Sequence, residues 1–132
     1  MLIVDDDVTL LRHAQSCLVD LAELYVALTG EDAVRICRRI LPDLVLLDLY
    51  LGDTDGLSVL RALRADEALQ DLPVVLVSSE RDPLARDRAF ALDVVHWLPK
   101  PLDAARLRAC VSVALQPRPD RLLRPAAPPA NP

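Results

Sequence analysis

Lysine, glycine and aromatic residues are all scarce in this chain of 132 residues. Its 15 basic residues comprise 14 arginines and a single lysine, Lys100, and it has only three glycines, one Phe, one Trp and two Tyr. Three glycines leave no room for a glycine-rich phosphate-binding loop. The few aromatic rings and the net charge of −5 argue against a nucleic-acid-binding surface, which needs clustered cations and stacking side chains.

Long hydrophobic runs are also missing. No apolar stretch approaches the ~20 residues of a membrane span, and the N-terminus lacks the basic segment of a signal peptide. We therefore expect a cytoplasmic protein without a membrane partner. The three cysteines lie far apart on apolar helical faces, which predicts buried, reduced thiols. A length of 132 residues with 52% hydrophobic content suits a single domain with a substantial core.

Short apolar segments alternate with helical patterns along the chain. Segments 2–4, 24–28, 44–47, 74–77 and 94–98 are apolar without alternation, as in strands that are covered on both faces. Helical spacing runs through 10–21, 33–40 and 57–63, and two further helices are expected to begin at Asp82-Pro83 and at Asp103. Five βα units predict an α/β fold with a doubly wound, five-stranded parallel sheet.

The composition changes at Pro117, because six of the 11 prolines fall in the last 16 residues. We expect a domain over residues 1–116 and a proline-rich flexible tail or linker over 117–132. The chain either acts alone through protein contacts or is part of a larger regulator.

Polar side chains follow four of the predicted strands: Asp5-Asp6-Asp7, Asp48, Ser78-Ser79 and Lys100. The carboxyl ends of parallel strands form the usual ligand site of such sheets. Carboxylates about 5 Å apart repel by about 3 kcal/mol per pair at an effective dielectric of ~20. A hard divalent cation would relieve that repulsion, and Mg²⁺ is the expected one because it accepts carboxylate and phosphate oxygens.

A phosphorylated Asp48 would suit this group of side chains. The phosphoryl group would replace one negative charge by roughly two. Mg²⁺, the Lys100 ammonium and the Ser78 hydroxyl form one plausible set of partners for its oxygens. Each piece also has a structural explanation, since Asp7 suits a helix N-cap and Ser78-Ser79 an ordinary turn. Their joint occurrence at four strand ends favours the functional explanation.

These motifs resemble the receiver domain of two-component response regulators over residues 2–115. The resemblance rests on four motifs: Val4-Asp5-Asp6-Asp7, Leu46-Leu47-Asp48 with Asp55-Gly56 downstream, Pro73 to Ser79, and Lys100-Pro101. It implies a flavodoxin-like (βα)5 fold with strand order 2-1-3-4-5. It also implies that Asp48 accepts a phosphoryl group from a sensor histidine kinase or a phosphotransfer protein.

The resemblance further implies a role for each site residue. Asp5, Asp6, Asp48 and the backbone carbonyl of Tyr50 would hold Mg²⁺. Lys100 would pair with the phosphoryl oxygens, and its peptide bond to Pro101 would be cis. The switch residues would be Ser78 and Trp97.

The same resemblance implies a signalling domain rather than an enzyme, with only self-directed phosphoryl transfer and slow autodephosphorylation. Phosphorylation would alter the surface of the fourth helix, fifth strand and fifth helix, where an unknown downstream protein binds. We expect no nucleic-acid contact, and either a monomer or a phosphorylation-dependent dimer.

Three positions depart from the usual receiver pattern. Tyr50 places a bulky ring two residues after the acceptor, where it could shield an acyl phosphate from water. Asp93 stands where glycine is common before the fifth strand, although Asp tolerates a positive φ less well. Pro99 removes a backbone donor and stiffens the segment between Trp97 and Lys100.

Two alternatives remain open from the sequence. A small haloacid-dehalogenase-like, Mg²⁺-dependent phosphatase also uses an Asp nucleophile with a second Asp two positions on, a spacing that Asp5 and Asp7 match. That interpretation leaves Asp48 and Asp55-Gly56 unexplained. A pseudo-receiver that binds partners constitutively is the other alternative, although every expected type of site residue is present.

Overall fold

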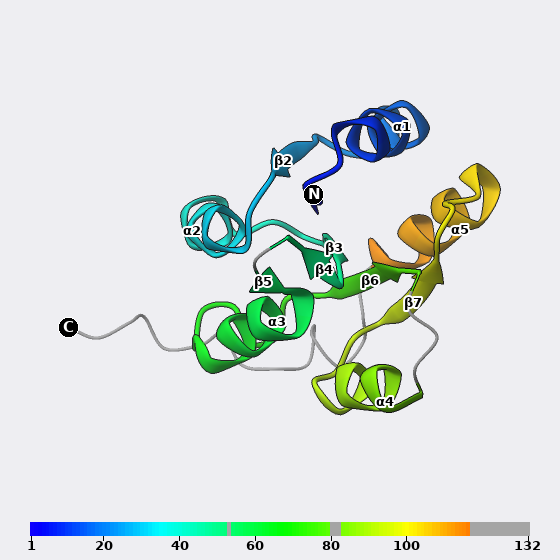
Figure 1. Cartoon of the computed structure of the whole chain (residues 1–132). Helices are drawn as coiled ribbons and strands as arrows, with labels where there is room; N and C mark the ends of the chain where they lie inside the picture. The colour runs from blue at the N-terminus through cyan, green and yellow to red at the C-terminus, as the bar shows by residue number, and fades with distance from the viewer. Residues whose placement is uncertain (53, 80–82, 117–132) are drawn as a thin grey trace.

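The computed structural model describes residues 1–52, 54–79 and 83–116, and the elements alternate along the chain (Figure 1). The strands are β1 (Leu2–Val4), β2 (Tyr25–Ala27), β3 (Val45–Asp48), β4 (Tyr50–Leu51), β5 (Thr54–Asp55), β6 (Val74–Ser78) and β7 (His96–Pro99). The helices are α1 (Val8–Leu18), α2 (Gly30–Ile40), α3 (Gly56–Ala65), α4 (Pro83–Ala91) and α5 (Ala104–Ala114).

Five strands form one parallel sheet in the order β2-β1-β3-β6-β7. Because β6 and β7 are the fourth and fifth of the predicted strands, this order confirms the expected α/β fold with 2-1-3-4-5 topology. The chain reverses direction of winding between β1 and β3, so the carboxyl ends of these strands border the crevice in which such folds bind ligands.

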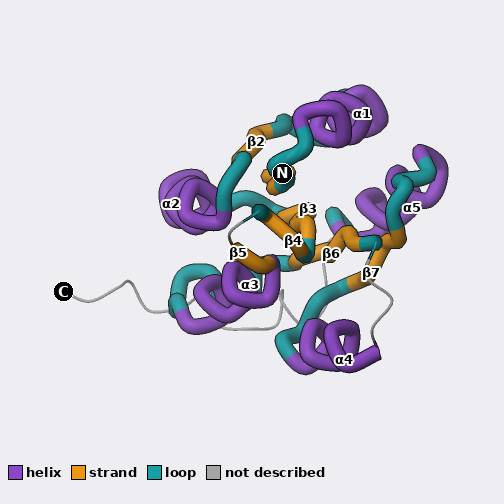
Figure 2. Tube along the Cα trace, viewed as in Figure 1, coloured by secondary structure: helices purple, strands orange, loops and turns teal. Residues whose placement is uncertain are grey.

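Helices cover both faces of the sheet, with α1 and α5 on one face and α2, α3 and α4 on the other (Figure 2). Alternate strand residues face opposite layers. Leu2, Val45 and Leu76 pack toward α2, α3 and α4, while Ile3 and Leu46 pack toward α1 and α5. Burial on both faces explains why the strands are apolar without alternation.

Side-chain caps fix where several helices begin. Asp7 accepts hydrogen bonds from the backbone N–H groups of Thr9 and Leu10 at the start of α1. Asp103 caps α5 in the same way, as its position predicted. The predicted cap Asp82 lies outside the described residues, although α4 does begin at Pro83 as expected.

Several predicted boundaries were wrong. The last strand begins at His96 rather than at residue 94, β2 is shorter than the predicted 24–28, and α1 ends three residues before Leu21. The cysteine prediction holds for Cys37, which is buried, but Cys17 and Cys110 are only half-buried. The antiparallel pair of β4 and β5 was not expected, because two residues per strand are too few to give a hydrophobic pattern.

The predicted tail, residues 117–132, lies outside the described residues. Among the described residues, no helix combines the length and the apolar character that crossing a membrane would require.

Gly56 lies against the backbone of the last residue of β3. Its N–H group donates to the carbonyl of Leu49. A Cβ at Gly56 would collide with the carbonyl oxygen of Asp48 and would lie 2.9 Å from the Cα of Leu49. The start of α3 can therefore approach the end of β3 only because residue 56 has no side chain.

We expect Gly56→Ala to lower the free energy of unfolding by about 1 to 3 kcal/mol, since the new methyl group forces backbone apart. This loss would occur even though alanine is the better helix former. Urea unfolding measures the change. Ser58→Ala, at an exposed position of the same helix, is the control and should change the stability by no more than about 0.5 kcal/mol. An unchanged stability of Gly56→Ala would show that this close approach has no energetic consequence.

Candidate functional site

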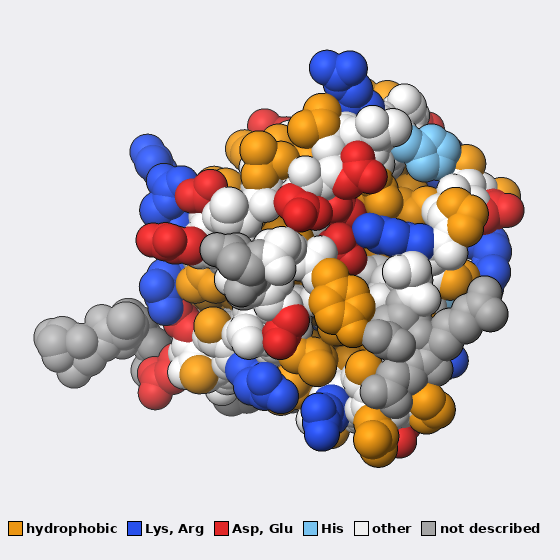
Figure 3. Space-filling view, in the orientation of Figure 1, with side chains coloured by type: hydrophobic (Ala, Val, Ile, Leu, Met, Phe, Trp, Pro, Cys, Tyr) orange, Lys and Arg blue, Asp and Glu red, His pale blue; other side chains and the backbone are white. Residues whose placement is uncertain are grey.

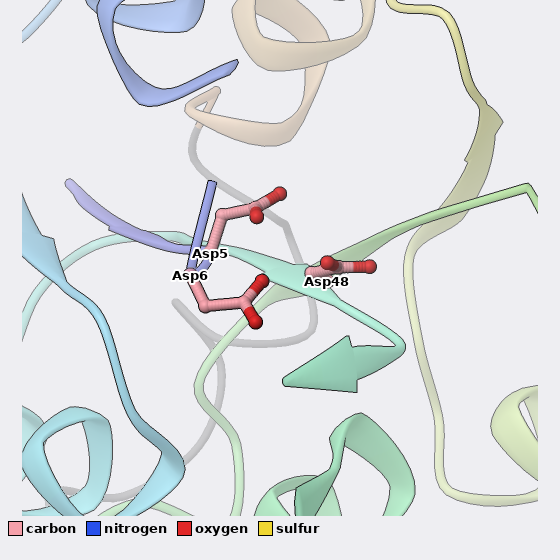
Figure 4. A group of neighbouring side chains, drawn as sticks. All are labelled: Asp5, Asp6 and Asp48. Atoms are coloured by element: carbon pink, nitrogen blue, oxygen red, sulfur yellow. The ribbon is translucent and has the colours of Figure 1, made fainter. Parts of the chain in front are cut away.

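The carboxyl ends of β1, β3 and β7 bring two acids and the single lysine together. The Nζ atom of Lys100 lies 3.0 Å from Oδ2 of Asp48 and 3.3 Å from Oδ2 of Asp5. Asp6 completes an acidic group, whose ligand atoms all lie within 4.8 Å of one another. Figure 4 shows the three carboxylates clustered at the strand ends. Figure 3 shows acidic side chains gathered at the centre of this face, with a basic side chain beside them.

Burial makes this cluster electrostatically costly. Asp5 is 1% exposed and Asp48 is 5% exposed, whereas Asp6 lies at the surface. Burial raises the pKa of Asp5 to about 6, against the opposing effect of the Asp7 N–H donor, and the nearby charge of Asp48 adds to the rise. The free protein therefore holds one of its site carboxylates close to protonation at neutral pH.

Lys100 is positioned by its backbone as well as by its charge. The N–H of Lys100 donates to the carbonyl of Ser78 at 3.0 Å, which joins the end of β7 to the end of β6. Burial lowers the pKa of the ammonium, but the Asp48 and Asp5 carboxylates more than offset this, so the pKa is raised overall. The expected cis peptide bond between Lys100 and Pro101 is present.

One oxygen of Asp5 lacks a hydrogen bond. Oδ1 accepts from the N–H of Asp7 at 2.8 Å. Within the described part of the chain the buried Oδ2 has no hydrogen-bond partner, and its contact with the Lys100 ammonium at 3.3 Å is an ion pair. Buried carboxylate oxygens are normally satisfied. This oxygen and the neighbouring carboxylate oxygens are ligands of the kind that a hard cation such as Mg²⁺ prefers. The residues present therefore fit that ion.

The hairpin of β4 and β5 lies beside these acids. The N–H of Tyr50 donates to Oδ1 of Asp48 at 3.3 Å. Gly52 has a φ of 74°, and a Cβ at this position would lie 3.5 Å from Oδ2 of Asp6. Asp55 ends the hairpin and caps α3 by accepting from the N–H of Ser58 at 2.7 Å. Sequence reasoning missed the hairpin, whose one local signal is a glycine suited to a turn.

The two predicted switch residues lie in different surroundings. Ser78 is buried at the end of β6, next to β7, and its carbonyl is the acceptor for Lys100. Trp97 is buried on the face of the sheet that α2, α3 and α4 cover, and it belongs to the core rather than to the acidic cluster.

The sequence model of the response regulator receiver domain matches residues 1–112. The cyclic di-GMP phosphodiesterase response regulator RpfG of Xanthomonas campestris pv. campestris is 33% identical over 119 residues, covering 88% of this chain and 32% of that protein. The regulatory protein LuxO of Vibrio vulnificus is 31% identical over 114 residues, covering 86% and 25% respectively. The chain thus spans a quarter to a third of the length of these relatives.

A similar solved structure is the receiver domain of NtrX from Brucella abortus. It has a TM-score of 0.78 and 28% sequence identity, and the match covers 86% of this chain and 96% of that one. The haloacid-dehalogenase-like alternative is not supported by these matches. Its second acid would be Asp7, whose carboxylate serves as the cap of α1.

We expect Asp5→Asn to stabilise the protein at pH 7 when divalent cations are chelated. The folded state keeps a proton on Asp5 up to about pH 6, whereas the unfolded chain releases it near pH 4. The stability contributed by Asp5 is therefore lost as the pH rises through this window. Asn carries no charge to desolvate, so its gain at pH 7 should be about 1 to 3 kcal/mol and should shrink toward pH 4.

Urea unfolding at several pH values in EDTA measures this gain. Asp87→Asn is the control, since Asp87 is an exposed carboxylate on α4 outside the acidic cluster and its substitution should change the stability by no more than about 0.5 kcal/mol. A variant Asp5→Asn that is less stable than the parent at pH 7 would contradict the charge imbalance inferred here.

Proposed function

The chain belongs to the response regulator receiver domain family, and from that membership we propose that Asp48 accepts a phosphoryl group from a phosphohistidine. The donor would be a sensor histidine kinase or a phosphotransfer protein. The observation that supports this most strongly is the buried contact between Asp48 and the only lysine of the chain, at 3.0 Å. A buried carboxylate with one oxygen on a compact ammonium is prepared for an incoming group that carries more negative charge.

The transfer needs no general base. A carboxylate oxygen of Asp48 forms a bond to phosphorus while the bond between phosphorus and the donor nitrogen breaks. The electron pair of the broken bond remains on the imidazole nitrogen, so charge and atoms balance without a proton from this chain. The phosphorylated Asp48 carries roughly two negative charges, and the Lys100 ammonium lies close enough to pair with a phosphoryl oxygen.

Asp5, Asp6, Asp48 and the backbone carbonyl of Tyr50 are the residues that would hold Mg²⁺. When bound, the ion supplies positive charge for the phosphoryl oxygens of the donor and of the product. The unsatisfied Oδ2 of Asp5 supports this assignment, as does the grouping of three carboxylates within 4.8 Å. Ser78 would provide the hydroxyl that moves toward the phosphoryl group.

Space for the donor lies beside Lys100, which contacts the acceptor Asp48. A cavity of about 550 Å³ opens next to Lys100, and its lining includes the apolar side chains of Leu10, Pro101 and Leu102. The side chain of His13 borders the same space, and its Nε2 lies 3.2 Å from the carbonyl oxygen of Leu102. A partner helix carrying phosphohistidine could bury apolar surface here while presenting phosphorus to Asp48.

The output surface in this proposal is formed by α4, β7 and α5. A groove of about 420 Å³ between β7 and α5 is lined by apolar side chains such as Val95, Leu98 and Val113, and Phe90 on α4 is exposed. Exposed apolar side chains of this kind suit binding to another protein. Phosphorylation would change the populations of two conformations of this surface, with Trp97 reporting the change from the core.

The chain is a signalling domain in this proposal, with slow self-directed dephosphorylation as its only turnover. Residues 1–116 form the receiver and 117–132 a linker or tail. Its own downstream partner is an unidentified protein, and it would be a monomer or a dimer that depends on phosphorylation. The phosphodiesterase named in RpfG is a property of that longer relative.

We expect incubation with acetyl phosphate and Mg²⁺ to add one stable phosphoryl group, measured by the intact mass of the protein. Asp48→Asn should remain unlabelled because its side chain cannot form an acyl phosphate. Omission of Mg²⁺ should reduce labelling strongly. Labelling of Asp48→Asn, or rapid release of inorganic phosphate over many turnovers, would contradict a phosphoacceptor and favour a phosphatase.

The lifetime of the labelled protein tests the role of the exposed Tyr50 ring. We expect Tyr50→Asn to lose the phosphoryl group several-fold faster than the parent, because the ring that excludes water from the acyl phosphate is gone. Decay of the phosphorylated mass with time measures both rates. Tyr25→Asn, which removes the ring of a partly exposed tyrosine on the edge strand β2, should decay at the parent rate. Equal rates for Tyr50→Asn and the parent would eliminate shielding.

A further inference from the structure

The side chain of Arg64 binds two separate loops, the one that precedes β6 and the one that joins α4 to β7. It lies in the last turn of α3, and its guanidinium donates hydrogen bonds to four backbone carbonyls. Two acceptors, Gln70 at 3.1 Å and Leu72 at 2.8 Å, precede β6. The other two, Leu92 at 2.8 Å and Asp93 at 3.2 Å, form the turn from α4 to β7. One side chain therefore fastens the end of α4 to α3 and to the entry of β6.

The turn that Arg64 holds contains a strained residue. Asp93 has a φ of 62°, in the left-handed region that disfavours residues with a Cβ. Its N–H donates to the carbonyl of Phe90 at 3.0 Å, and the N–H of Leu92 donates to the carbonyl of Ala89 at 3.0 Å. The carbonyls of Leu92 and Asp93 both accept hydrogen bonds from the guanidinium. Arg64 therefore stabilises the left-handed conformation of Asp93, which the Cβ atom disfavours.

The one buried residue of helix α4 lies near its C-terminal end. Ala89 is its one buried residue, while Ala85 and the following Leu92 are half-buried against the core. Leu84, near the other end, is 62% exposed. The hydrogen bonds from Arg64 therefore secure the end of α4 that carries its one buried residue.

We propose that Arg64 is a positioning residue for the conformational change of α4 on phosphorylation. Its hydrogen bonds hold Leu92 and Asp93 in place, so that α4 can rotate about its C-terminal end. The N-terminal end of α4 begins five residues after Ser78, on the side of the phosphoacceptor. Movement there would swing α4 against a fixed junction with β7. This inference deepens the proposed function, on which its phosphorylation-dependent part rests.

The role requires a guanidinium rather than a positive charge alone. The planar fork of arginine presents five N–H donors in fixed directions, which can reach carbonyls on two separate segments. A lysine has one nitrogen at the end of a flexible stem and cannot bridge the same acceptors. Arg64→Lys therefore keeps the charge and removes the clamp.

The test compares Arg64→Lys with Arg61→Lys, which alters an exposed arginine one turn earlier on α3. Hydrogen exchange is measured by mass spectrometry without and with Mg²⁺ and beryllofluoride, a mimic of the phosphoryl group. For Arg64→Lys we expect amides of residues 89–95 to exchange at least about tenfold faster than in the parent. We also expect loss of the beryllofluoride-dependent change over 83–91. Arg61→Lys should match the parent in both respects.

A second substitution distinguishes an effect of Arg64 on the turn at Asp93 from a general effect on the stability of the fold. Asp93→Gly removes the Cβ from the left-handed residue, so the double variant Arg64→Lys/Asp93→Gly should return exchange at 89–95 to within about twofold of the parent. It should also restore the beryllofluoride response. Exchange that stays fast in the double variant, or parent-like exchange in Arg64→Lys, would overturn the inference.

Labelling of Asp48 by acetyl phosphate keeps this test distinct from that of the proposed function. Arg64→Lys should be labelled like the parent, because Arg64 does not touch the acidic cluster. If the parent itself is not labelled, the proposed function fails, and exchange in the free proteins still decides whether Arg64 holds the turn. If labelling is lost in Arg64→Lys alone, Arg64 acts on the site and the inference is wrong.

Discussion

Two buried carboxylates that share one ammonium are the constraint on which the site depends. Asp5 and Asp48 are almost completely shielded from water, and Lys100 is within 3.3 Å of both. With the surface carboxylate of Asp6, the cluster carries three acids against one base. Burial, with the neighbouring charge of Asp48, raises the pKa of Asp5 to about 6, and among the described residues the Oδ2 atom of Asp5 has no hydrogen-bond partner. A divalent cation would bring the formal charge of the cluster to zero. The cation and the Lys100 ammonium would then supply positive charge for the oxygens of a phosphoryl group.

The fold holds this unfavourable cluster through backbone contacts that do not involve its charges. Asp48 ends a strand that is hydrogen-bonded to neighbours on both sides, and Gly56 lets α3 close against its carbonyl. The N–H of Lys100 is fixed to the carbonyl of Ser78. Because these contacts set the positions first, the side chains face one another despite the cost of burying them, as is common where a site is kept for function.

The sequence was sufficient for the sheet and most of the site, because both follow from local patterns. Apolar segments and the polar residues that follow them predicted a parallel sheet and the meeting of Asp5, Asp48 and Lys100, whereas the strand order came from the resemblance to receiver domains. The hydrogen bonds from the Arg64 guanidinium could not be predicted. Their acceptors are backbone carbonyls up to 29 residues away, and a backbone carbonyl gives no signal in the sequence of side chains. Asp93 adopts a left-handed conformation at a position where glycine is common, and the distant Arg64 donates a hydrogen bond to its carbonyl.

The most direct test of the charge imbalance is a calorimetric titration of the metal-free protein with Mg²⁺ at pH 7. We expect a single binding site in the parent, at least about tenfold weaker binding by Asp5→Asn, and unchanged binding by Asp103→Asn, which alters a carboxylate that caps α5. Absence of saturable binding by the parent, or equal affinity in Asp5→Asn, would contradict the assignment of this cluster as a cation site that serves phosphoryl transfer.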